Sequence, residues 1–437
     1  MTPTRTPSFR QRREWLRAAL AATGGLALPG WMHTALAAST RTPGQLTATP
    51  TARVIVVGGG MAGATVAKYL RLWGNNLEVT LVEPNATYLS CIMSSLVLTG
   101  QRTMAAQSFN YKTLASRYGV KVVIDKVTGI DPANRRVTLA SGGTLSADRI
   151  VIAPGIDFDP VPGLTDPNAM PHAWKAGSQT TTLRQQLQAL PAQGTAILTI
   201  PPTPYRCPPG PYERACLLAD WLKKYKPGAK LLVLDANPDF VAEKDNFSRA
   251  FYDLHASVIE YHTSVAIQSA DAATMTLQTS AGAVHGDVIN LIPRQRCAPI
   301  VAATGLANAT DGRFAGVDVL SYESLVAPGI HVIGDSSATT QPKAGHIANQ
   351  EAKVCADAIV RLLAGQALDP APVTNSACYS TITMSQASWL TAVFQYDAGS
   401  HAMASVANAS GASSGWSTGN FEQMNTWFKA LMADTFA

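Results

Sequence analysis

The strongest pattern along the chain is an apolar run, a glycine turn and a helical period that begin near residue 52. The stretch RVIVVGGGMAGATVAKYLRLWGNNLEVTLVEPN predicts a strand, a tight turn, a helix and a second strand that ends in Glu83. Gly58, Gly60 and Gly63 give a G-x-G-x-x-G spacing, and Glu83 follows the last of them by twenty residues. Such glycines let a pyrophosphate approach a helix N-terminus, and the acid binds a ribose. The unit therefore predicts dinucleotide binding.

Two later apolar strands have the form of returns to the same domain. LSADRIVIAPGIDFDPVPG predicts a strand with a crossover after it, and APGIHVIGDSSA predicts a strand that ends at Gly334 and Asp335. After a dinucleotide fingerprint, a Gly-Asp pair at this place typically puts a carboxylate on the ribityl chain of a flavin. We therefore expect FAD rather than NAD, bound by a discontinuous domain over residues 52–162 and 290–365.

Between these segments, residues 163–289 form a second α/β unit with a strand, GTAILTI, and a helix, YERACLLADWLKKYK. The connection IPPTPYRCPPGPYERAC stands where a nucleotide-binding fold has its glycine-rich turn. Gly210 is its only glycine, and six prolines stiffen it. Prolines remove backbone donors, and without glycines the backbone cannot approach a phosphate. We expect a Rossmann-like domain without an NAD fingerprint, so NAD(P)H is not the expected electron donor.

The last region, residues 366–437, shows little regular pattern. Trp389, Trp416 and Trp427 stand there among small polar residues, which suggests that some surface is covered. A capping or dimerisation segment and a surface for a specific partner are both compatible with this composition.

The first 37 residues have the pattern of an export signal. Arg12 and Arg13 precede an apolar run, and the Ala-Leu-Ala at 35–37 resembles a cleavage site. A Thr/Pro/Ala linker follows at 38–51. The twin-arginine route carries proteins folded around a cofactor, so a periplasmic location is expected. A plain amphipathic helix is the alternative interpretation.

Composition favours two or three packed domains and excludes several classes of function. Apolar residues make up 46% and charged residues 14% of the 437 positions, which is not a disordered or coiled-coil composition. Five arginines and one glutamate give residues 1–37 a net +4 of the chain's +5, so the remainder carries only +1. Neither nucleic acid nor an anionic membrane is therefore an expected partner. No later apolar run is long enough to span a bilayer. The histidines lack metal-ligand spacing and there is no C-x-x-C-H motif, so we expect no metal site and no haem on this chain.

The six cysteines match no zinc pattern, and one of them stands near the expected cofactor. Cys91 lies eight residues beyond Glu83, on a loop that can run along the cofactor toward the isoalloxazine. Its thiolate could bond covalently to the flavin or react with it, and a packed thiol is the alternative. Cys355 lies in a helical run and is expected in the core, whereas Cys378 is either packed or paired.

Several strings together resemble the flavoprotein subunit of flavocytochrome c sulfide dehydrogenase. In chain order they are VVGGGMAGATVAKYL, VTLVEPNATYLSC, YRCPPGPYERA, DVINLIPRQR, GIHVIGD, PKAG, NSACYS and the terminal DTFA. The resemblance runs from about residue 52 to the end. RCPPGPYERA is the most specific of these strings because it is long and unusual.

The resemblance implies a periplasmic flavoprotein that passes electrons from sulfide to a c-type cytochrome subunit, with haem only on that separate chain. Cys91 matches the cysteine that holds FAD covalently. Cys207 matches one half of a redox-active disulfide that takes up sulfide sulfur, and Glu213 matches an acidic residue near it that would accept a proton.

One position departs from the family pattern as we align it. There the second redox-active cysteine lies two residues after the Gly-Asp pair, where this chain has Ser337, and a hydroxyl cannot form a disulfide. Three hypotheses follow. Cys207 pairs with another cysteine, for which Cys216 and Cys297 are the candidates. Cys207 acts alone as a thiolate whose pKa is lowered by a helix N-terminus. In the third hypothesis, this chain has lost sulfide oxidation.

The sequence as a whole predicts an α/β flavoprotein of the disulfide-reductase type, with two dinucleotide-binding domains and a C-terminal flavocytochrome or dimer-interface domain. The expected function is FAD-dependent oxidation of sulfide, or of a related sulfur compound, with a c-type cytochrome as partner. A flavoprotein acting on another sulfur species in a thiosulfate-oxidising system is one alternative. A catalytically impaired electron-transfer subunit is the other.

Overall fold

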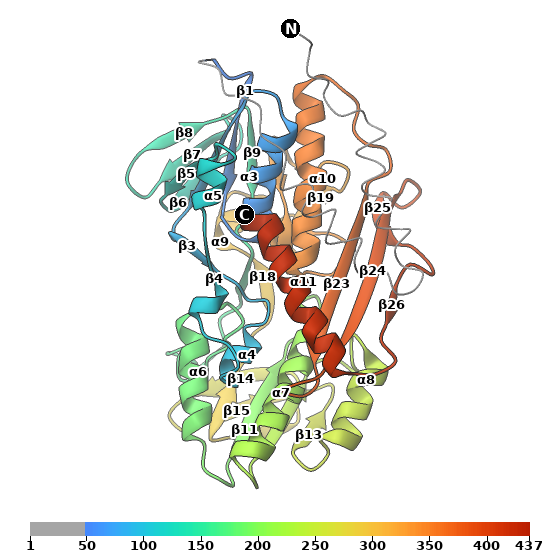
Figure 1. The fold of residues 1–437 in the computed structure, drawn as a ribbon. Helices are drawn as coiled ribbons and strands as arrows, with labels where there is room; N and C mark the ends of the chain where they lie inside the picture. The colour runs from blue at the N-terminus through green and yellow to red at the C-terminus, as the bar shows by residue number, and fades with distance from the viewer. Residues whose placement is uncertain (1–48) are drawn as a thin grey trace.

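The computed structural model describes residues 49–437 (Figure 1). The expected signal peptide at 1–37 and most of the linker at 38–51 lie outside the described residues. Within the described part of the chain, no helix combines the length and the apolarity needed to cross a membrane.

The first domain forms on an eight-stranded sheet, as expected for the dinucleotide-binding unit. β1 (Ala52–Val57) lies inside it and pairs in parallel with β2 (Leu77–Glu83) and β9 (Arg149–Ile152). α3 (Met61–Trp73) connects β1 to β2 and packs against α10 (Gly345–Leu363). From one edge the strands are β22 (Ser337–Ala338), β19 (Ala315–Asp318), β20 (Glu323–Ser324), β21 (Ala327–Val332), β9, β1, β2 and β5 (Lys121–Ile124). The parallel strands β1, β2 and β21 therefore end at one edge of the sheet, where the sequence places its cofactor motifs.

Short elements complete this domain. They are β3 (Thr87–Leu89), which pairs with β4 (Ser108–Asn110); the helices α4 (Ser95–Leu98) and α5 (Lys112–Ser116); and the antiparallel sheet of β6 (Val127–Asp131), β7 (Arg136–Leu139) and β8 (Thr144–Ser146). The pair β10 (Ile156–Phe158) and β18 (Gln295–Cys297), followed by α9 (Pro299–Ala303), stands where the chain leaves the domain and returns to it.

The second domain has a four-stranded parallel sheet in the order β13 (Ile259–His262), β12 (Lys230–Asp235), β11 (Thr195–Ile200) and β17 (Val288–Asn290). Its other elements are α6 (Ser178–Ala189), α7 (Gly210–Tyr225), α8 (Lys244–Arg249), a π-helical turn at Ala250–Leu254, and the antiparallel strands β14 (Ile267–Asp271), β15 (Thr276–Thr279) and β16 (Gly282–His285). The helix α7 begins inside the proline-rich turn. The first four N–H groups of a helix have no partner within it, so Pro211, which lacks an N–H, is tolerated there.

The C-terminal region is more regular than the sequence suggests, and that prediction is wrong. It consists of β23 (Val373–Thr381), β24 (Ala387–Asp397), β25 (Ala402–Ser405), β26 (Gly411–Ala412) and α11 (Thr418–Phe436). β23 reads VTNSACYST, and most of these residues are buried. A strand of small polar residues buried on both faces shows no alternation of apolar and polar positions, so periodicity misses it.

The C-terminal region covers its own chain. Figure 1 shows β23, β24 and α11 running alongside both domains. β23 packs against α10 of the first domain and α7 of the second, and α11 packs against α3. Aromatic contacts anchor the end of the chain: Phe436 stacks on Tyr88 and Phe109. This arrangement agrees with the capping interpretation.

Candidate active site

The glycine turn after β1 has the geometry that dinucleotide binding requires. Gly58 adopts φ +99°, a conformation that side chains disfavour. A Cβ on Gly63 would lie 1.7 Å from the Gly58 carbonyl oxygen. Gly60 forms the N-cap of α3 and places no side chain in front of the first N–H groups of that helix. The turn therefore leaves the N-terminus of α3 accessible to a phosphate.

Glu83, at the end of β2, holds its carboxylate at the same turn. Its Oε2 accepts a hydrogen bond from the Gly59 N–H (2.8 Å), and its Oε1 accepts from the Asn85 N–H (3.0 Å) and side-chain amide (2.9 Å). These bonds fix the carboxylate beside the phosphate turn. This is the placement expected of an acid that binds an adenosine ribose.

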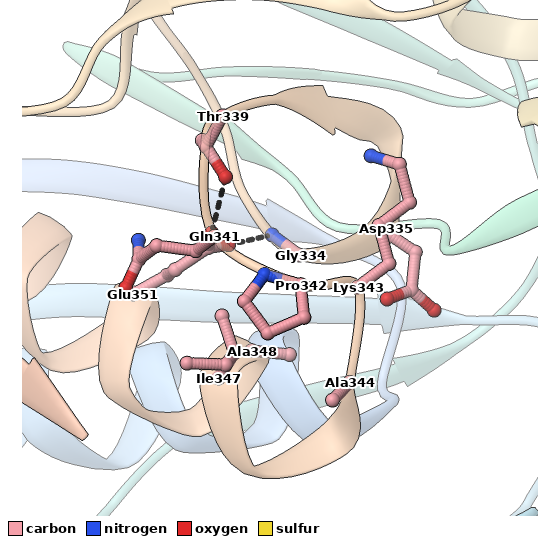
Figure 2. Close-up of a pocket in the computed structure, with 10 residues that line it drawn as sticks. All are labelled: Gly334, Asp335, Thr339, Gln341, Pro342, Lys343, Ala344, Ile347, Ala348 and Glu351. Atoms are coloured by element: carbon pink, nitrogen blue, oxygen red, sulfur yellow. Dashed lines mark hydrogen bonds between the residues drawn. The ribbon is translucent and has the colours of Figure 1, made fainter. Parts of the chain in front are cut away.

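Asp335 follows β21 and lies in a pocket at the N-terminus of α10 (Figure 2). Its Oδ1 is buried and has no hydrogen-bond partner among residues 49–437, while its Oδ2 lies 3.8 Å from Nη1 of Arg206. A buried acceptor without a donor is costly, so this oxygen fits a ligand hydroxyl. The glycine turn, Glu83 and Asp335 together fit FAD, with Asp335 in the place of the residue that binds the ribityl chain.

A buried carboxylate closes the inner side of that pocket. Glu351 on α10 accepts hydrogen bonds from the Gly334 N–H (2.7 Å) and from the Thr339 hydroxyl (3.4 Å), which Figure 2 marks with dashed lines. Burial raises the pKa of Glu351 to about 8. These two bonds fix the Gly-Asp turn against α10 and so position Asp335.

Arg206 brings the separate sequence motifs together. Its side chain is mostly buried, and the pKa of its guanidinium is raised by Cys91, Asp335, Tyr88 and Cys207, in that order, against the opposing effect of burial. The guanidinium also donates to the Trp174 carbonyl. One cation thus has both candidate cysteines and the flavin-directed carboxylate as neighbours. The sequence analysis did not single it out, although it adjoins Cys207 in the most specific string.

Cys91 follows β3 directly and is partly exposed. Its Sγ accepts a hydrogen bond from the Ala176 N–H at 3.3 Å. Cys91 therefore lies in the region defined by Asp335 and Arg206, as the loop interpretation expects.

Cys207 lies at the centre of the proline-rich turn in a constrained backbone conformation. Its φ is +60°, its N–H donates to the Lys343 carbonyl (2.6 Å), and its carbonyl accepts from the Gly210 N–H (2.8 Å). A Cβ on Gly210 would lie 2.8 Å from the Cys207 sulfur. The only glycine of the turn is thus needed to make room for the thiol.

The thiol of Cys207 has another cysteine as its neighbour. Burial raises its pKa well above the usual value, Cys378 and then Glu213 raise it further, and Arg206 lowers it. The expectation that a helix N-terminus lowers this pKa is therefore wrong: burial and two acidic neighbours outweigh the cation. Burial likewise raises the pKa of Cys378 to about 12. Two neighbouring thiols that both resist ionisation are suited to a dithiol and disulfide couple.

The cysteines proposed from the sequence as partners of Cys207 lie elsewhere. Cys216 is buried inside α7, where Glu213 and Glu243 are its strongest charged neighbours. Cys297 on β18 is buried beside Arg296 and Lys343.

Ser337 is also occupied elsewhere: its hydroxyl donates to the Gly334 carbonyl at 2.8 Å. The neighbour of Cys207 is Cys378, which the sequence left as either packed or paired. Cys378, rather than Ser337, thus lies close enough to raise the pKa of Cys207, and both thiols are free in this structure. Cys355 is buried in the core cluster, as expected.

Glu213 lies in the first turn of α7, six residues after Cys207. Its Oε1 accepts a hydrogen bond from the Thr381 hydroxyl of β23 at 2.9 Å. Burial raises its pKa to about 7 against the lowering effects of Thr381 and Arg214. A carboxylate with this pKa can take up and release a proton near neutral pH.

In the second domain, the acid that ends β12 is already satisfied by the protein. Asp235 accepts hydrogen bonds from the hydroxyls of Tyr212 (2.7 Å) and Tyr261 (2.8 Å), and from Asn237 (2.7 Å from its side chain). In a nucleotide-binding domain this position binds the ribose. Here aromatic side chains fill the space around it. Within residues 49–437 there is also no cluster of three or more acidic, histidine or cysteine side chains able to hold a metal ion.

Comparison with known proteins agrees with this geometry. Three family models match consecutive parts of the chain: pyridine nucleotide-disulphide oxidoreductase over residues 52–193, the central part of the sulfide dehydrogenase [flavocytochrome c] flavoprotein chain over 180–293, and flavocytochrome c sulphide dehydrogenase, flavin-binding, over 370–436. A sulfide dehydrogenase [flavocytochrome c] flavoprotein chain from Chlorobaculum thiosulfatiphilum is 51% identical over 47 residues, which are 11% of this chain and 98% of that sequence. The chain therefore belongs to the family of sulfide dehydrogenase [flavocytochrome c] flavoprotein chains.

Sulfide:quinone oxidoreductases match longer stretches of the chain at lower identity. The mitochondrial enzyme of Mus musculus is 27% identical over 177 residues, which are 39% of this chain and 38% of that protein. The sulfide:quinone oxidoreductase structure from Aquifex aeolicus superimposes with a TM-score of 0.70 at 19% identity, over 87% of this chain and 92% of that one. At this identity the likeness establishes the fold. The expected fold with two dinucleotide-binding domains of the disulfide-reductase type is confirmed, and the chain binds FAD.

Proposed function

We propose that this flavoprotein oxidises sulfide, or a related reduced sulfur compound, on a Cys207 and Cys378 pair beside FAD, and passes the electrons to a c-type cytochrome subunit. One observation carries the proposal. Cys207, Cys378 and Glu213 are neighbours, and Arg206 joins this group to Cys91 and Asp335. A sulfur-reactive pair, a proton acceptor and the flavin-directed residues thus converge on one site.

The roles follow from the chemistry of these side chains. When the pair is a disulfide, attack by HS⁻ forms a persulfide on one cysteine and releases the other as a thiolate. Arg206, next to Cys207, stabilises the negative charge that develops there. Glu213 accepts the proton of the persulfide. Bound FAD supplies an acceptor for two electrons.

Cysteine replacement tests the pair. We expect C207S and C378S each to abolish bleaching of the flavin absorbance by sulfide under anaerobic conditions, because either change prevents disulfide formation. C355S is the matched control, since that thiol lies in the core away from the site. Bleaching by C378S at the wild-type rate would rule out the pair and favour a single thiolate at Cys207.

We further propose that Cys91 holds the flavin covalently. Its partial exposure, its place near Arg206 and the hydrogen bond from the Ala176 N–H, which orients the sulfur, support this assignment. After acid precipitation, the yellow colour is expected in the wild-type pellet and in the C91S supernatant. Colour in the supernatant of both proteins would contradict covalent attachment.

Two electron acceptors are candidates, a c-type cytochrome and a quinone. The Chlorobaculum relative is named a flavocytochrome c chain, which supports a cytochrome partner in the periplasm, whereas the mouse and Aquifex relatives are named quinone oxidoreductases. We expect sulfide-dependent reduction of a c-type cytochrome and little reduction of a short-chain ubiquinone. The reverse ratio of rates would favour quinone. The occupied Asp235 site supports a chain that does not take electrons from NAD(P)H.

A further inference from the structure

A second carboxylate lies close to the cysteine pair, and neither the sequence motifs nor the proposed chemistry uses it. Glu243 ends the loop between β12 and α8, with a left-handed φ of +47°. Its side chain turns inward: Oε2 accepts a hydrogen bond from the Ser388 hydroxyl at 3.0 Å. Oε1 is buried without a hydrogen bond of regular geometry to any residue in 49–437. A loop carboxylate that leaves water in this way calls for an explanation.

The register of the C-terminal sheet places Glu243 over the face that carries Cys378. Ser388 on β24 pairs directly with Ser380 on β23. Ser380 and Cys378 are two residues apart, so their side chains share a face of the strand. The Ser380 hydroxyl is buried and also lacks a regular partner among the described residues, although it lies close enough to Glu243 to lower its pKa. Ser380 and Ser388 thus hold the Glu243 carboxylate against the face that carries Cys378.

The same strand links Glu243 to Glu213. Thr381, next to Ser380, donates to Glu213 at 2.9 Å. Each carboxylate has a pKa raised to about 7, chiefly by burial, and Glu243 also raises that of Glu213. Both of them raise the pKa of Cys378.

The other charged groups around this cluster come from the proline-rich turn, where Arg206 lowers the pKa of Cys207, from α7, and from the loop and helix that carry Glu243. From α7, Arg214 lowers the pKa of Glu213, and Lys223 acts weakly on Cys216. Beside Glu243 on its own loop and helix, Lys244 pairs with Asp239 in solvent, and Asp245 is exposed. No cation of this set pairs with Glu243, so a proton is the remaining means of neutralising it.

We propose that Glu243 is a positioning residue that shares one proton with Glu213 and relays it from the cysteine pair to the surface loop at 239–243. The inference rests on the proposed function. Two nearby carboxylates in a poorly solvated site favour holding a proton between them. Adjacent residues of β23 hold the two carboxylates, Thr381 that of Glu213 and Ser380 that of Glu243, and the loop that carries Glu243 leads to solvent.

The proton balance gives the relay its role. Attack of HS⁻ on the disulfide breaks one S–S bond and makes another, which yields a persulfide and a thiolate. Ionisation of the persulfide releases the single proton of HS⁻ to Glu213. The two electrons go to the flavin when zero-valent sulfur leaves. Glu213 must then lose its proton before the next turnover, and Glu243 is the group positioned to take it.

Thiol alkylation tests the relay without turnover. Flavin-loaded full-length protein is reduced with dithiothreitol, exchanged into buffers across neutral pH, and treated with iodoacetamide. Mass spectrometry then follows modification of Cys378 and Cys207. We expect E243Q to raise the rate of Cys378 alkylation roughly 3- to 10-fold at each pH above 7, because a negative charge that opposes the thiolate is gone. The step near pH 7 in the rate of sulfide-dependent flavin bleaching should flatten, and E243D should restore both profiles.

D245N is the matched control, since it removes an exposed carboxylate two residues away and should move neither profile. An E243Q alkylation profile identical to that of the wild type would overturn the relay. If E243Q fails to fold, S388A replaces it: loss of the donor raises the pKa of Glu243 and keeps it neutral to higher pH, so Cys378 alkylation near neutral pH should become faster, as in E243Q, and no change would refute the link. Absence of bleaching in the wild type would refute the proposed function, while the alkylation shift would still decide whether Glu243 acts on the pair.

Discussion

At the scale of single residues, the site is distinguished by polar atoms that the protein leaves without partners. Asp335 Oδ1 and Glu243 Oε1 are both buried and unsatisfied within residues 49–437. Asp235, by contrast, lies in an otherwise similar strand-end position, and its carboxylate accepts bonds from two tyrosines and an asparagine. Folding thus satisfies Asp235 with side chains of the protein, whereas it leaves Asp335 Oδ1 able to accept a hydrogen bond from a ligand. The unsatisfied oxygen of Asp335 therefore distinguishes the flavin site from the strand end at Asp235.

Removal of the Asp335 carboxylate should reduce flavin binding. We expect D335A to be purified with markedly less flavin than the wild type, since the acceptor for the ribityl chain is lost and Arg206 loses its ion pair. D335N keeps one acceptor oxygen and should retain more. The ratio of flavin to protein absorbance measures this, with D253N as an exposed control. Full flavin content in D335A would show that Asp335 does not hold the cofactor.

At the scale of elements, α11 is fixed to the first domain through one buried acid. Asp434 accepts from the Tyr69 hydroxyl (2.6 Å) and from Asn349 (2.9 Å), and pairs with Lys353 (2.8 Å). Burial alone would raise its pKa, but Lys353 and Lys68 lower it to about 2. The helix thus packs on the middle of α3, at Thr65, Lys68 and Tyr69, next to the aromatic cluster around Phe436. The position of β23, and with it Cys378, depends on this docking.

Loss of that acid should destabilise the protein strongly. We expect D434A to lower the free energy of unfolding at neutral pH by about 3–5 kcal/mol, because Lys353 and Lys68 are left buried without their partner. A carboxylate whose pKa is lowered by folding stabilises the fold at any pH above its ordinary pKa, and this stabilisation is lost as the pH falls toward 2. The difference in stability between D434A and the wild type should therefore shrink in acid. Urea denaturation measures both. E422A, an exposed acid on the same helix, is expected to change little.

At the scale of the whole molecule, the cysteine pair exists because three regions meet. Cys91 comes from the first domain, Cys207 and Glu213 from the second, and Cys378 from the C-terminal sheet. Arg214, beside Glu213, is the largest fully buried side chain and lies over the Trp174 ring at 4.6 Å. Its hydrogen bonds join the domains, to Ser95 Oγ (3.2 Å), His172 O (3.1 Å), Asn290 Oδ1 (3.0 Å) and Ala173 O (2.9 Å).

Replacement of this arginine should loosen the site as well as the fold. We expect R214M to cost about 3–5 kcal/mol in unfolding free energy, since buried acceptors lose their donor. Limited proteolysis between the domains should accelerate. R136M removes an arginine that is exposed and pairs only at the surface, so a change within about 0.5 kcal/mol is expected. Equal stability of R214M and R136M would contradict the joining role.

The sequence by itself determined the local chemistry. The glycine turn, the acid at the end of β2, the Gly-Asp pair and the proline-stiffened cysteine all follow from residues close together in the chain, where backbone conformation and hydrogen bonding are decided locally. They located the first domain and the family resemblance. The same local reasoning missed β23, because a strand of buried small polar residues carries no periodic signal, and it missed β24, whose apolar residues do not alternate regularly with polar ones.

Only the tertiary structure decided which groups face each other. Cys207 and Cys378 are 171 positions apart in the numbering, and no spacing rule connects them. Their meeting depends on β23 packing against α7, and the raised pKa of Cys207 depends on burial that a helix N-terminus does not outweigh. The sequence favoured Ser337 as the position opposite Cys207 because it followed a motif. Long-range packing brings Cys378 close to Cys207 instead. Contacts between distant parts of the chain are determined by the surfaces that folding buries, and not by separation in sequence.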